Sequence, residues 1–311
     1  MAKFVPLVLK DLAFIIPCYN EEESIGFVVG EISSRFPLAQ IVVCDNNSTD
    51  STCDVAREAG ATVLFERRKG KGNAVRRLLR DVDADIFVMV DGDNTYDLSQ
   101  LGQAIDVFRT GCFDLMTGDR FAGQSRSHFR KGHGTGNIFF TSFFRLAFGI
   151  QTRDVFSGLR IFSRRLVKTF PLVSAEFEIE TELTIYAARM RLPADDFPTS
   201  VRSRVNSESK LSTFRDGFKI LTFSLRLLHR EFPMRLYLPF SVLAALVAVI
   251  LFAIPYSEFL STGEVSTIPT LVTSTIFVSI AIVSLFAGLI LKEVSNLKYE
   301  QRYLRYLGYS R

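Results

Sequence analysis

Apolar and polar positions divide the chain into two regions that meet at about residue 210. Before that point, short apolar runs alternate with stretches of helical periodicity. The short runs have the length and β-branched content of strands buried on both faces, as in a parallel sheet. They lie at residues 12–16, 40–44, 61–65, 86–90 and 113–117. Helical patterns near residues 22–35, 49–59, 71–81 and 98–109 separate them. The alternation predicts an α/β sheet with right-handed crossovers.

A different pattern begins after Lys210. Six apolar residues recur at intervals of three and four and so form one stripe of a helix: Leu211, Phe214, Phe218, Leu221, Leu225 and Leu228. The basic residues Arg215, Lys219, Arg226 and Arg230 lie off this stripe. A basic amphipathic helix directly before a membrane span is typical of a helix that lies on anionic lipid. The alternative is a helix that packs on the preceding domain.

Two long apolar runs follow at residues 236–256 and 268–291. Each has about the 20 residues that a helix needs to cross a bilayer. Between Arg235 and Lys292 the only charged residues are Glu258 and Glu264. Lys and Arg number six in residues 210–235 and five in residues 292–311, whereas residues 257–267 have none. The positive-inside rule then predicts that both termini are cytoplasmic. A buried hairpin of a soluble protein is the alternative.

Composition narrows the classes of function. Of the 311 residues, 48% are hydrophobic and 23% charged, which excludes a disordered chain. The net charge of +4 is too small to indicate a nucleic-acid partner. The four cysteines have neither C-x-x-C spacing nor the long-range spacing of metal ligands. A disulfide scaffold and a structural zinc site are therefore not expected.

Acidic residues follow two of the predicted strands. Asp45 comes directly after the second strand, and Asp91 and Asp93 flank Gly92 after the fourth. Ligands of open α/β sheets bind at the carboxyl ends of the strands, so Asp45 is placed to accept hydrogen bonds from a nucleobase or ribose. Two carboxylates beside a glycine can approach one ion, and their hard oxygens suit Mg²⁺ or Mn²⁺. A simple turn is the alternative for D-G-D.

Two further segments are candidates for binding. Residues 67–72, R-R-K-G-K-G, follow the third strand and open a helix. This position favours an anion, although the dinucleotide-binding fingerprint is not completed and a solvated charge run is the alternative. Glu178, Glu180 and Glu182 alternate with apolar residues at the start of another predicted helix. One of them could face a sugar, or the three could simply favour the helix N-terminus.

Together these segments resemble the family 2 glycosyltransferases of the GT-A fold. The resemblance is closest to polyprenyl-phosphate sugar transferases such as dolichyl-phosphate mannose synthase and bactoprenol glucosyltransferase, and it covers residues 12–220. It rests on an ordered set of motifs: I-I-P-C-Y-N-E at 15–21, D-N-N-S-T-D at 45–50, G-K-G at 70–72, D-G-D at 91–93, G-D-R-F at 118–121, D-V-F-S-G-L-R at 154–160, F-E-I-E at 177–180 and S-K-L at 209–211. One departure is that Thr95 stands where mannose synthases tend to have a metal-ligating glutamine.

The resemblance implies roles for individual residues. Asp45 would hold the base of the donor, and Asp91 and Asp93 would contact its ribose and a diphosphate-bound Mg²⁺ or Mn²⁺. The full set of donor-binding candidates is Pro17, Tyr19, Asn20, Glu21, Asp45, Lys71, Gly72 and Asp91. The acceptor phosphate would be bound by Arg120, Arg130, Lys210 and a basic residue before S-K-L, either Arg204 or Arg202. The candidates for catalysis are Asp91, Asp93, Arg120, Arg204 and Lys210.

The implied activity is inverting transfer of a sugar from a nucleotide sugar to a polyprenyl phosphate such as undecaprenyl phosphate. UDP-hexose or UDP-N-acetylhexosamine donors are favoured, and GDP-mannose stays open. We expect a catalytic GT-A domain at residues 1–210, a juxtamembrane helix at 211–235, two transmembrane helices at 236–291 and a basic tail at 292–311. The catalytic domain and both termini would face the cytoplasm at the inner membrane. The expected partners are the donor, the lipid acceptor, the bilayer and, from related members, a further copy of the chain.

Three other functions are alternatives for a chain with these features. A processive polysaccharide synthase would resemble this sheet but carry a Q-x-x-R-W motif, and this chain has no Trp. A catalytically silent membrane scaffold would not need the intact set of Asp45, Asp91, Asp93, Arg120 and Lys210. A nucleotidyltransferase that makes the sugar nucleotide has no evident need for two membrane spans.

Overall fold

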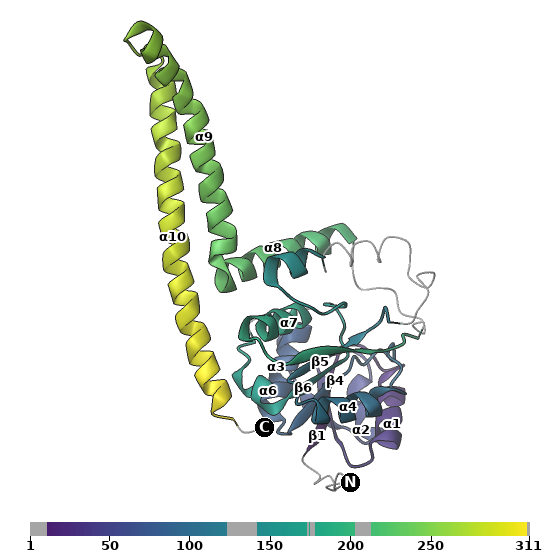
Figure 1. The fold of residues 1–311 in the computed structure, drawn as a ribbon. Helices are drawn as coiled ribbons and strands as arrows, with labels where there is room; N and C mark the ends of the chain where they lie inside the picture. Colours follow the sequence, from purple (N-terminus) through teal and green to yellow (C-terminus); the bar gives the residue numbers. More distant parts are fainter. Residues whose placement is uncertain (1–10, 123–141, 173, 175–177, 203–212, 310–311) are drawn as a thin grey trace. The chain divides into compact units, whose positions relative to one another are not determined.

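The computed structural model describes residues 11–122, 142–172, 174, 178–202 and 213–309. Within these residues seven strands form one sheet in the order β3-β2-β1-β4-β6-β5-β7 (Figure 1). Neighbouring strands are parallel except for β6, which runs antiparallel to β4 and β5. The strands are β1 Leu12–Cys18, β2 Gln40–Asp45, β3 Thr62–Phe65, β4 Ile86–Met89, β5 Leu115–Asp119, β6 Arg160–Ser163 and β7 Ala194–Pro198. The mostly parallel α/β sheet predicted from the sequence is confirmed.

Helices cover both faces of this sheet. Alternate strand residues point to opposite faces, and Phe14 of β1 and Ile41 of β2 share one core with apolar residues of α1 (Ile25–Arg35), α2 (Thr52–Glu58) and α4 (Leu101–Thr110). Ala13 and Ile15 are buried outside that core. Helix α3 (Lys71–Asp81) contacts β1 and β2 and buries residues that also lie outside it. The sheet is therefore the middle layer. The remaining helices of this part are α6 (Arg164–Thr169), α7 (Ile179–Met190) and residues 142–148.

Strands β6 and β7 were missed by the sequence pattern. Strand β6 begins at Arg160, whose fully buried guanidinium donates to the backbone oxygens of Ser157 (2.8 Å) and Val155 (2.7 Å). Strand β7 reads A-D-D-F-P, with a single residue of its five buried. Neither has the apolar run that marks a buried strand. Their pairing with β4 and β5, rather than local propensity, determines that they form.

The chain divides into two compact units. The first comprises residues 1–213 together with 302–311, and the second comprises residues 214–301. The second contains α8 (Thr213–Glu231), α9 (Pro233–Thr262) and most of α10 (Ile268–Leu307). Helix α10 continues through the segment expected to be a tail, because residues 292–307 contain neither Gly nor Pro before Gly308. On the predicted stripe of α8, Leu228 is buried but Leu225 is exposed, and the placement of this helix on lipid stays a prediction.

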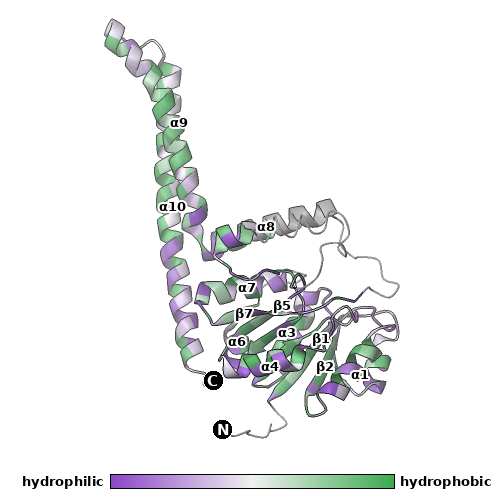
Figure 2. Ribbon diagram, turned by 45° about the vertical axis from the view of Figure 1, so that its right-hand side comes forward, coloured by the Kyte–Doolittle hydropathy of each residue, from purple (hydrophilic) through white to green (hydrophobic). Residues whose placement is uncertain are grey.

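Helices α9 and α10 are long and apolar enough to cross a membrane. Figure 2 shows apolar colouring along α9 and the first part of α10, and more hydrophilic colouring toward the end of α10. The two helices bury small side chains, and the Ser241 hydroxyl donates to the Ala281 carbonyl at 2.8 Å. The buried small residues include Ser241, Ala244, Ala248, Ala281 and Ser284. Close contact through small residues is how helices associate in lipid, and the large apolar side chains of both helices are largely exposed.

The end of α10 is held in the first unit by a buried polar cluster. Asp114, which is fully buried, accepts hydrogen bonds from Arg165 Nε (2.5 Å) and Nη2 (2.7 Å) and from the Tyr306 hydroxyl (2.6 Å). The Arg165 guanidinium also lies 4.6 Å from the centre of the Tyr306 ring. Hydrogen bonds to charged groups in such surroundings are strong. The cluster therefore fixes residues 302–307 against the sheet-bearing unit.

We expect Tyr306→Phe to lower the thermal stability of the purified protein in detergent. The variant keeps the ring but removes one hydrogen bond to a buried carboxylate, a loss of roughly 1.5–3 kcal/mol. Tyr309→Phe is the matched control, because Tyr309 is exposed and should leave the melting temperature unchanged. Equal melting temperatures for both variants would contradict a structural role for this cluster.

Candidate active site

Three loops at the carboxyl ends of β1, β2 and β4 form the candidate site. The chain passes from β1 outward to β2 and β3 and returns to β4 on the other side of β1, which is the arrangement at which open sheets bind ligands. Each loop contains an asparagine with positive φ: Asn20 (53°), Asn47 (65°) and Asn94 (54°). Asparagine tolerates this left-handed conformation better than most residues do. The three loops turn sharply there.

Hydrogen bonds join the loop after β1 to the loop after β2. The Asn20 amide donates to Ser48 Oγ at 3.0 Å, and the Thr49 amide donates to Asn20 Oδ1 at 2.9 Å. The Glu21 amide donates to Thr52 Oγ1 at 2.8 Å. The candidate donor-binding residues Asn20 and Glu21 are thus fixed beside the D-N-N-S-T-D motif.

Asp45 and Asn46, at the end of β2, form different kinds of contact. Asp45 is buried; its Oδ2 accepts the Ser48 amide at 3.2 Å, and its Oδ1 has no hydrogen-bond partner within the described residues. The Asn46 side chain donates to the Arg68 carbonyl at 2.7 Å and accepts the Gly70 amide at 2.6 Å. Asn46 therefore shapes the basic loop that precedes α3. The sequence pattern had given Asn46 no role, since only the fold shows which backbone it meets.

Lys71, the first residue of α3, lies between two carboxylates. Its Nζ is 2.5 Å from Asp91 Oδ1 and 2.5 Å from Glu180 Oε1. Burial lowers the pKa of Lys71, but the charges of Asp91 and Glu180 and their hydrogen bonds raise it by more, so the ammonium stays charged at neutral pH. Of the three glutamates considered at the start of α7, Glu180 is the one that the structure brings to Asp91 and Lys71.

Gly158 closes one side of the Asp91 carboxylate. A Cβ at position 158 would lie 2.7 Å from Asp91 Cγ and closer still to Oδ2. The Gly158 amide donates to the Tyr96 hydroxyl at 2.7 Å, which fixes the glycine in place. The G of D-V-F-S-G-L-R is thus required by contact with the D-G-D loop.

The D-G-D loop has a donor set that suits a divalent cation. Asp93 Oδ1 accepts the Thr95 amide at 3.1 Å, and the buried Thr95 hydroxyl has no hydrogen-bond partner in the described part of the chain. Burial, and then the charges of Glu21, Asp45 and Asp91, raise the pKa of the nearby Cys18 well above its ordinary value. The carboxylates of Glu21, Asp45 and Asp91 thus all lie close enough to Cys18 for their charges to act on one thiol. The described residues contain no group of three His, Cys, Asp or Glu side chains arranged for a metal. The oxygens of Asp91 and Asp93 are the ligand type of Mg²⁺, which one or two carboxylates commonly bind together with substrate phosphates.

Arg120, directly after β5, is paired with Asp154. Arg120 Nε and Nη2 donate to the two oxygens of the fully buried Asp154 at 2.5 and 2.9 Å. Burial lowers the pKa of Arg120, but Tyr96, Asp154 and Asp91 raise it by more, and the net direction is upward. The Arg120 guanidinium therefore stays charged at neutral pH and interacts electrostatically with Asp91 as well as with its partner Asp154. The motif that contains Asp154 does not by itself indicate a role for this residue. The contacts with Arg120 show that Asp154 orients the arginine.

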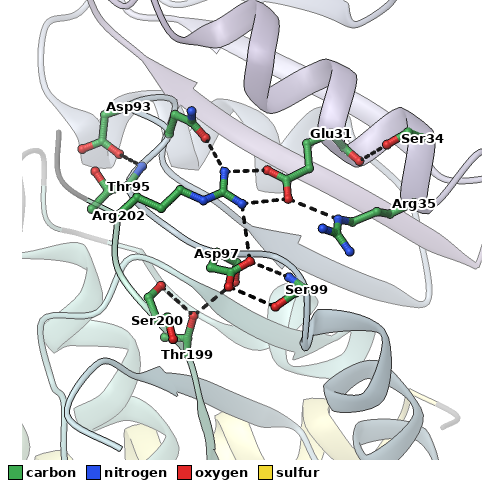
Figure 3. A network of polar contacts seen from close by, with 11 residues as sticks. Glu31, Ser34, Arg35, Asp93, Thr95, Asp97, Ser99, Thr199, Ser200 and Arg202 are labelled. Atoms are coloured by element: carbon green, nitrogen blue, oxygen red, sulfur yellow. Dashed lines mark hydrogen bonds and ion pairs between the residues drawn. The ribbon is translucent and has the colours of Figure 1, made fainter. Parts of the chain in front are cut away.

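Arg202 lies in a different network, shown in Figure 3. Its guanidinium makes two contacts with Glu31 (2.9 and 3.0 Å) and one each with Asn94 Oδ1 (3.1 Å) and Asp97 Oδ1 (3.4 Å). Its amide donates to the Thr95 carbonyl at 2.8 Å. Through these contacts Arg202 joins the D-G-D-N-T-Y loop to α1. The sequence predicted Arg202 as a candidate phosphate ligand.

The structure brings most of the predicted residues to this edge of the sheet. Pro17 of β1 is paired with Cys44 of β2. Lys69 Nζ lies 5.3 Å from the centre of the Tyr19 ring, and Gly72 is buried in the first turn of α3. Asp45 ends β2, Lys71 opens α3, Asp91 and Asp93 follow β4, and Arg120 follows β5. Arg130, Arg204 and Lys210 lie outside the described residues. The assignment of all these side chains to donor, metal or acceptor stays a prediction.

Comparison with known proteins agrees with this geometry. Residues 13–170 match the family described as Glycosyl transferase family 2. Protein RfbJ of Shigella flexneri is 49% identical over 123 residues, 40% of this chain and 95% of that protein. Dolichyl-phosphate hexose transferase of Haloferax volcanii is 30% identical over 210 residues, 68% of this chain and 90% of that protein. Glucosyl-3-phosphoglycerate synthase of Mycobacterium tuberculosis, solved with Mn²⁺ and UDP-glucose, has a TM-score of 0.56 at 24% identity, over 70% of this chain and 78% of that chain. The expected GT-A-like fold is confirmed.

Proposed function

The chain belongs to glycosyl transferase family 2 and is a glycosyltransferase, and we propose that it transfers a sugar from a nucleotide sugar to a polyprenyl phosphate. One observation carries this proposal. The acidic residues Asp45 and Asp91 and the basic residue Arg120 lie at the carboxyl ends of strands of one sheet, on a chain that also has two helices apolar enough to span a bilayer. The name of the Haloferax volcanii relative, a dolichyl-phosphate hexose transferase, supports the same class of acceptor. We favour a UDP-hexose or UDP-N-acetylhexosamine donor.

The donor would bind along the carboxyl ends of β1, β2 and β4. Asp45 keeps one buried carboxylate oxygen without a partner in the described residues, and this oxygen is suited to accept a hydrogen bond from the donor base. Asp91 and Asp93 would hold Mg²⁺ or Mn²⁺, consistent with the Mn²⁺ found with UDP-glucose in the mycobacterial enzyme of the same fold. Bound there, the cation would neutralise charge that develops on the departing nucleoside diphosphate.

The reaction is an in-line substitution with inversion. An oxygen of the acceptor phosphate forms a bond to the anomeric carbon while the bond from that carbon to the nucleoside diphosphate breaks. The phosphate is already ionised at neutral pH, so no strong general base is needed. The obstacle is bringing two anions together, and Arg120, oriented by Asp154, would reduce their repulsion. By resemblance, Arg130, Arg204 and Lys210 would act with it.

A membrane anchor suits this acceptor, because a polyprenyl phosphate stays in the bilayer with its head group at the surface. We place the catalytic domain and both termini on the cytoplasmic side of the inner membrane, from the distribution of Lys and Arg around the two spans. Association with further copies of the chain stays a prediction.

A donor screen tests the proposal. Purified protein is incubated with undecaprenyl phosphate, Mg²⁺ or Mn²⁺ and one radiolabelled nucleotide sugar at a time, and label in the organic phase is counted. We expect transfer from one donor, reduced by at least about a hundredfold in Asp93→Asn. No transfer from any donor, in the presence of measurable nucleotide binding, would favour the scaffold function or a different acceptor.

A further inference from the structure

The two oxygens of the buried Glu180 carboxylate have different surroundings. It is 4% exposed, and its Oε1 contacts Lys71 Nζ at 2.5 Å. Its Oε2 is buried and has no hydrogen-bond partner among the residues that the structure describes. Burying a charge that is only partly satisfied costs free energy. Lys71, in direct contact, and the charge of the fully buried Arg160 together make an ionised Glu180 tolerable at this position.

Lys71 contacts Oδ1 of Asp91, an oxygen through which Asp91 could bind a cation. Both oxygens of Asp91 lie close to Gly158, with Oδ2 the nearer, and Oδ1 is also in contact with Lys71 Nζ. A cation that binds Asp91 through Oδ1 must therefore displace the Lys71 ammonium, and the two positive charges repel each other. Lys71 has an alternative partner at the same distance, because Glu180 Oε1 is also 2.5 Å away.

We propose that Glu180 is a positioning residue that retains Lys71 when a divalent cation takes its place on Asp91. Glu180 and Asp91 compete for one ammonium, and the cation competes with that ammonium for Asp91. Removing the charge of Glu180 leaves Lys71 with Asp91 as its only carboxylate partner in this trio, which makes Lys71 harder to displace. The inference rests on the proposed function for its cation, but it concerns binding and needs no acceptor lipid.

The test is a titration of the full-length protein with Mn²⁺ in the presence of UDP, followed by the electron paramagnetic resonance signal of unbound Mn²⁺. We expect Glu180→Gln to raise the Mn²⁺ concentration for half-saturation by roughly tenfold, which corresponds to about 1.4 kcal/mol. Lys71→Met should lower it, because the competing ammonium is gone. In the Lys71→Met background, Glu180→Gln should change the midpoint by less than about threefold, because no ammonium is left to retain.

Two further variants separate this role from general effects. Glu182→Gln removes a buried carboxylate from the same helix. Glu182 accepts the Ser174 amide at 2.9 Å, and the Mn²⁺ midpoint of this variant should match wild type. Glu180→Asp keeps the charge and should fall between wild type and Glu180→Gln. Melting temperatures establish that each variant is folded.

Two results would overturn the inference while leaving the proposed function intact. One is an unchanged midpoint in folded Glu180→Gln. The other is the same tenfold shift in the Lys71→Met background, which would mean that Glu180 acts only through its negative field. Wild-type protein that binds no Mn²⁺ with UDP would overturn both this inference and the proposed metal site.

Discussion

Gly158→Ala is expected to reduce transfer by at least about a hundredfold, the scale of losing one preorganised charged group in an active site. The new methyl group would lie 2.7 Å from Asp91 Cγ and closer still to Oδ2, so the Asp91 carboxylate must turn away. Asp91 is short and is held by Lys71 at 2.5 Å, which leaves it little room to adjust. The measurement is the rate of label transfer to lipid, with the melting temperature as a check on folding.

Gly102→Ala is the matched control for this substitution. Gly102 lies in α4, and a Cβ there meets nothing within 4 Å. Alanine is favoured over glycine within a helix, so this variant should transfer sugar at the wild-type rate. A Gly158→Ala protein that retains activity within about threefold of wild type would show that the position of Asp91 is not critical.

Arg120→Lys should lower the transfer rate by about a hundredfold, with little change in binding of the nucleoside diphosphate. A lysine ammonium cannot reproduce the two contacts that Arg120 Nε and Nη2 make with Asp154. Because Asp154 is fully buried, the lysine will be drawn to it and will present its charge less well to a bound phosphate. Transfer kinetics and a separate nucleotide-binding titration check the two parts of this expectation.

Arg57→Lys serves as the control for Arg120→Lys, because the Arg57 side chain is 58% exposed and pairs with Asp54 within α2. It should change neither rate nor binding. Loss of nucleotide binding in Arg120→Lys would instead assign this arginine to the donor, and unchanged transfer would remove it from the active site.

The sheet was predictable because strands β1 and β4 consist of apolar residues throughout. Strand β1 is buried at every position, and the acidic residues that follow β2 and β4 could be assigned to one edge of the sheet from the chain order alone. Strands β6 and β7 could not be predicted, since Arg160 and the D-D pair of β7 interrupt any apolar run. They form because β4 and β5 offer unpaired edges.

The sequence could not predict which side chains far apart along the chain contact each other. Lys71 and Glu180 are 109 positions apart, and Arg202 and Glu31 are 171 apart. A motif shows that a basic residue belongs to the site, but not which carboxylate it meets. The sequence thus indicated Arg202 as a candidate phosphate ligand by its position before S-K-L, and the structure adds that its guanidinium contacts Glu31 and Asp97.

Two lipids that differ only in the acceptor group give the most direct test of transfer to a polyprenyl phosphate. The protein is incubated with the donor identified in the screen and with either undecaprenyl phosphate or undecaprenol, and the lipid fraction is analysed by mass spectrometry. We expect the phosphate to gain the mass of one sugar while the alcohol is unchanged. Glycosylation of the alcohol, or of neither lipid while the donor is consumed, would contradict transfer to a polyprenyl phosphate.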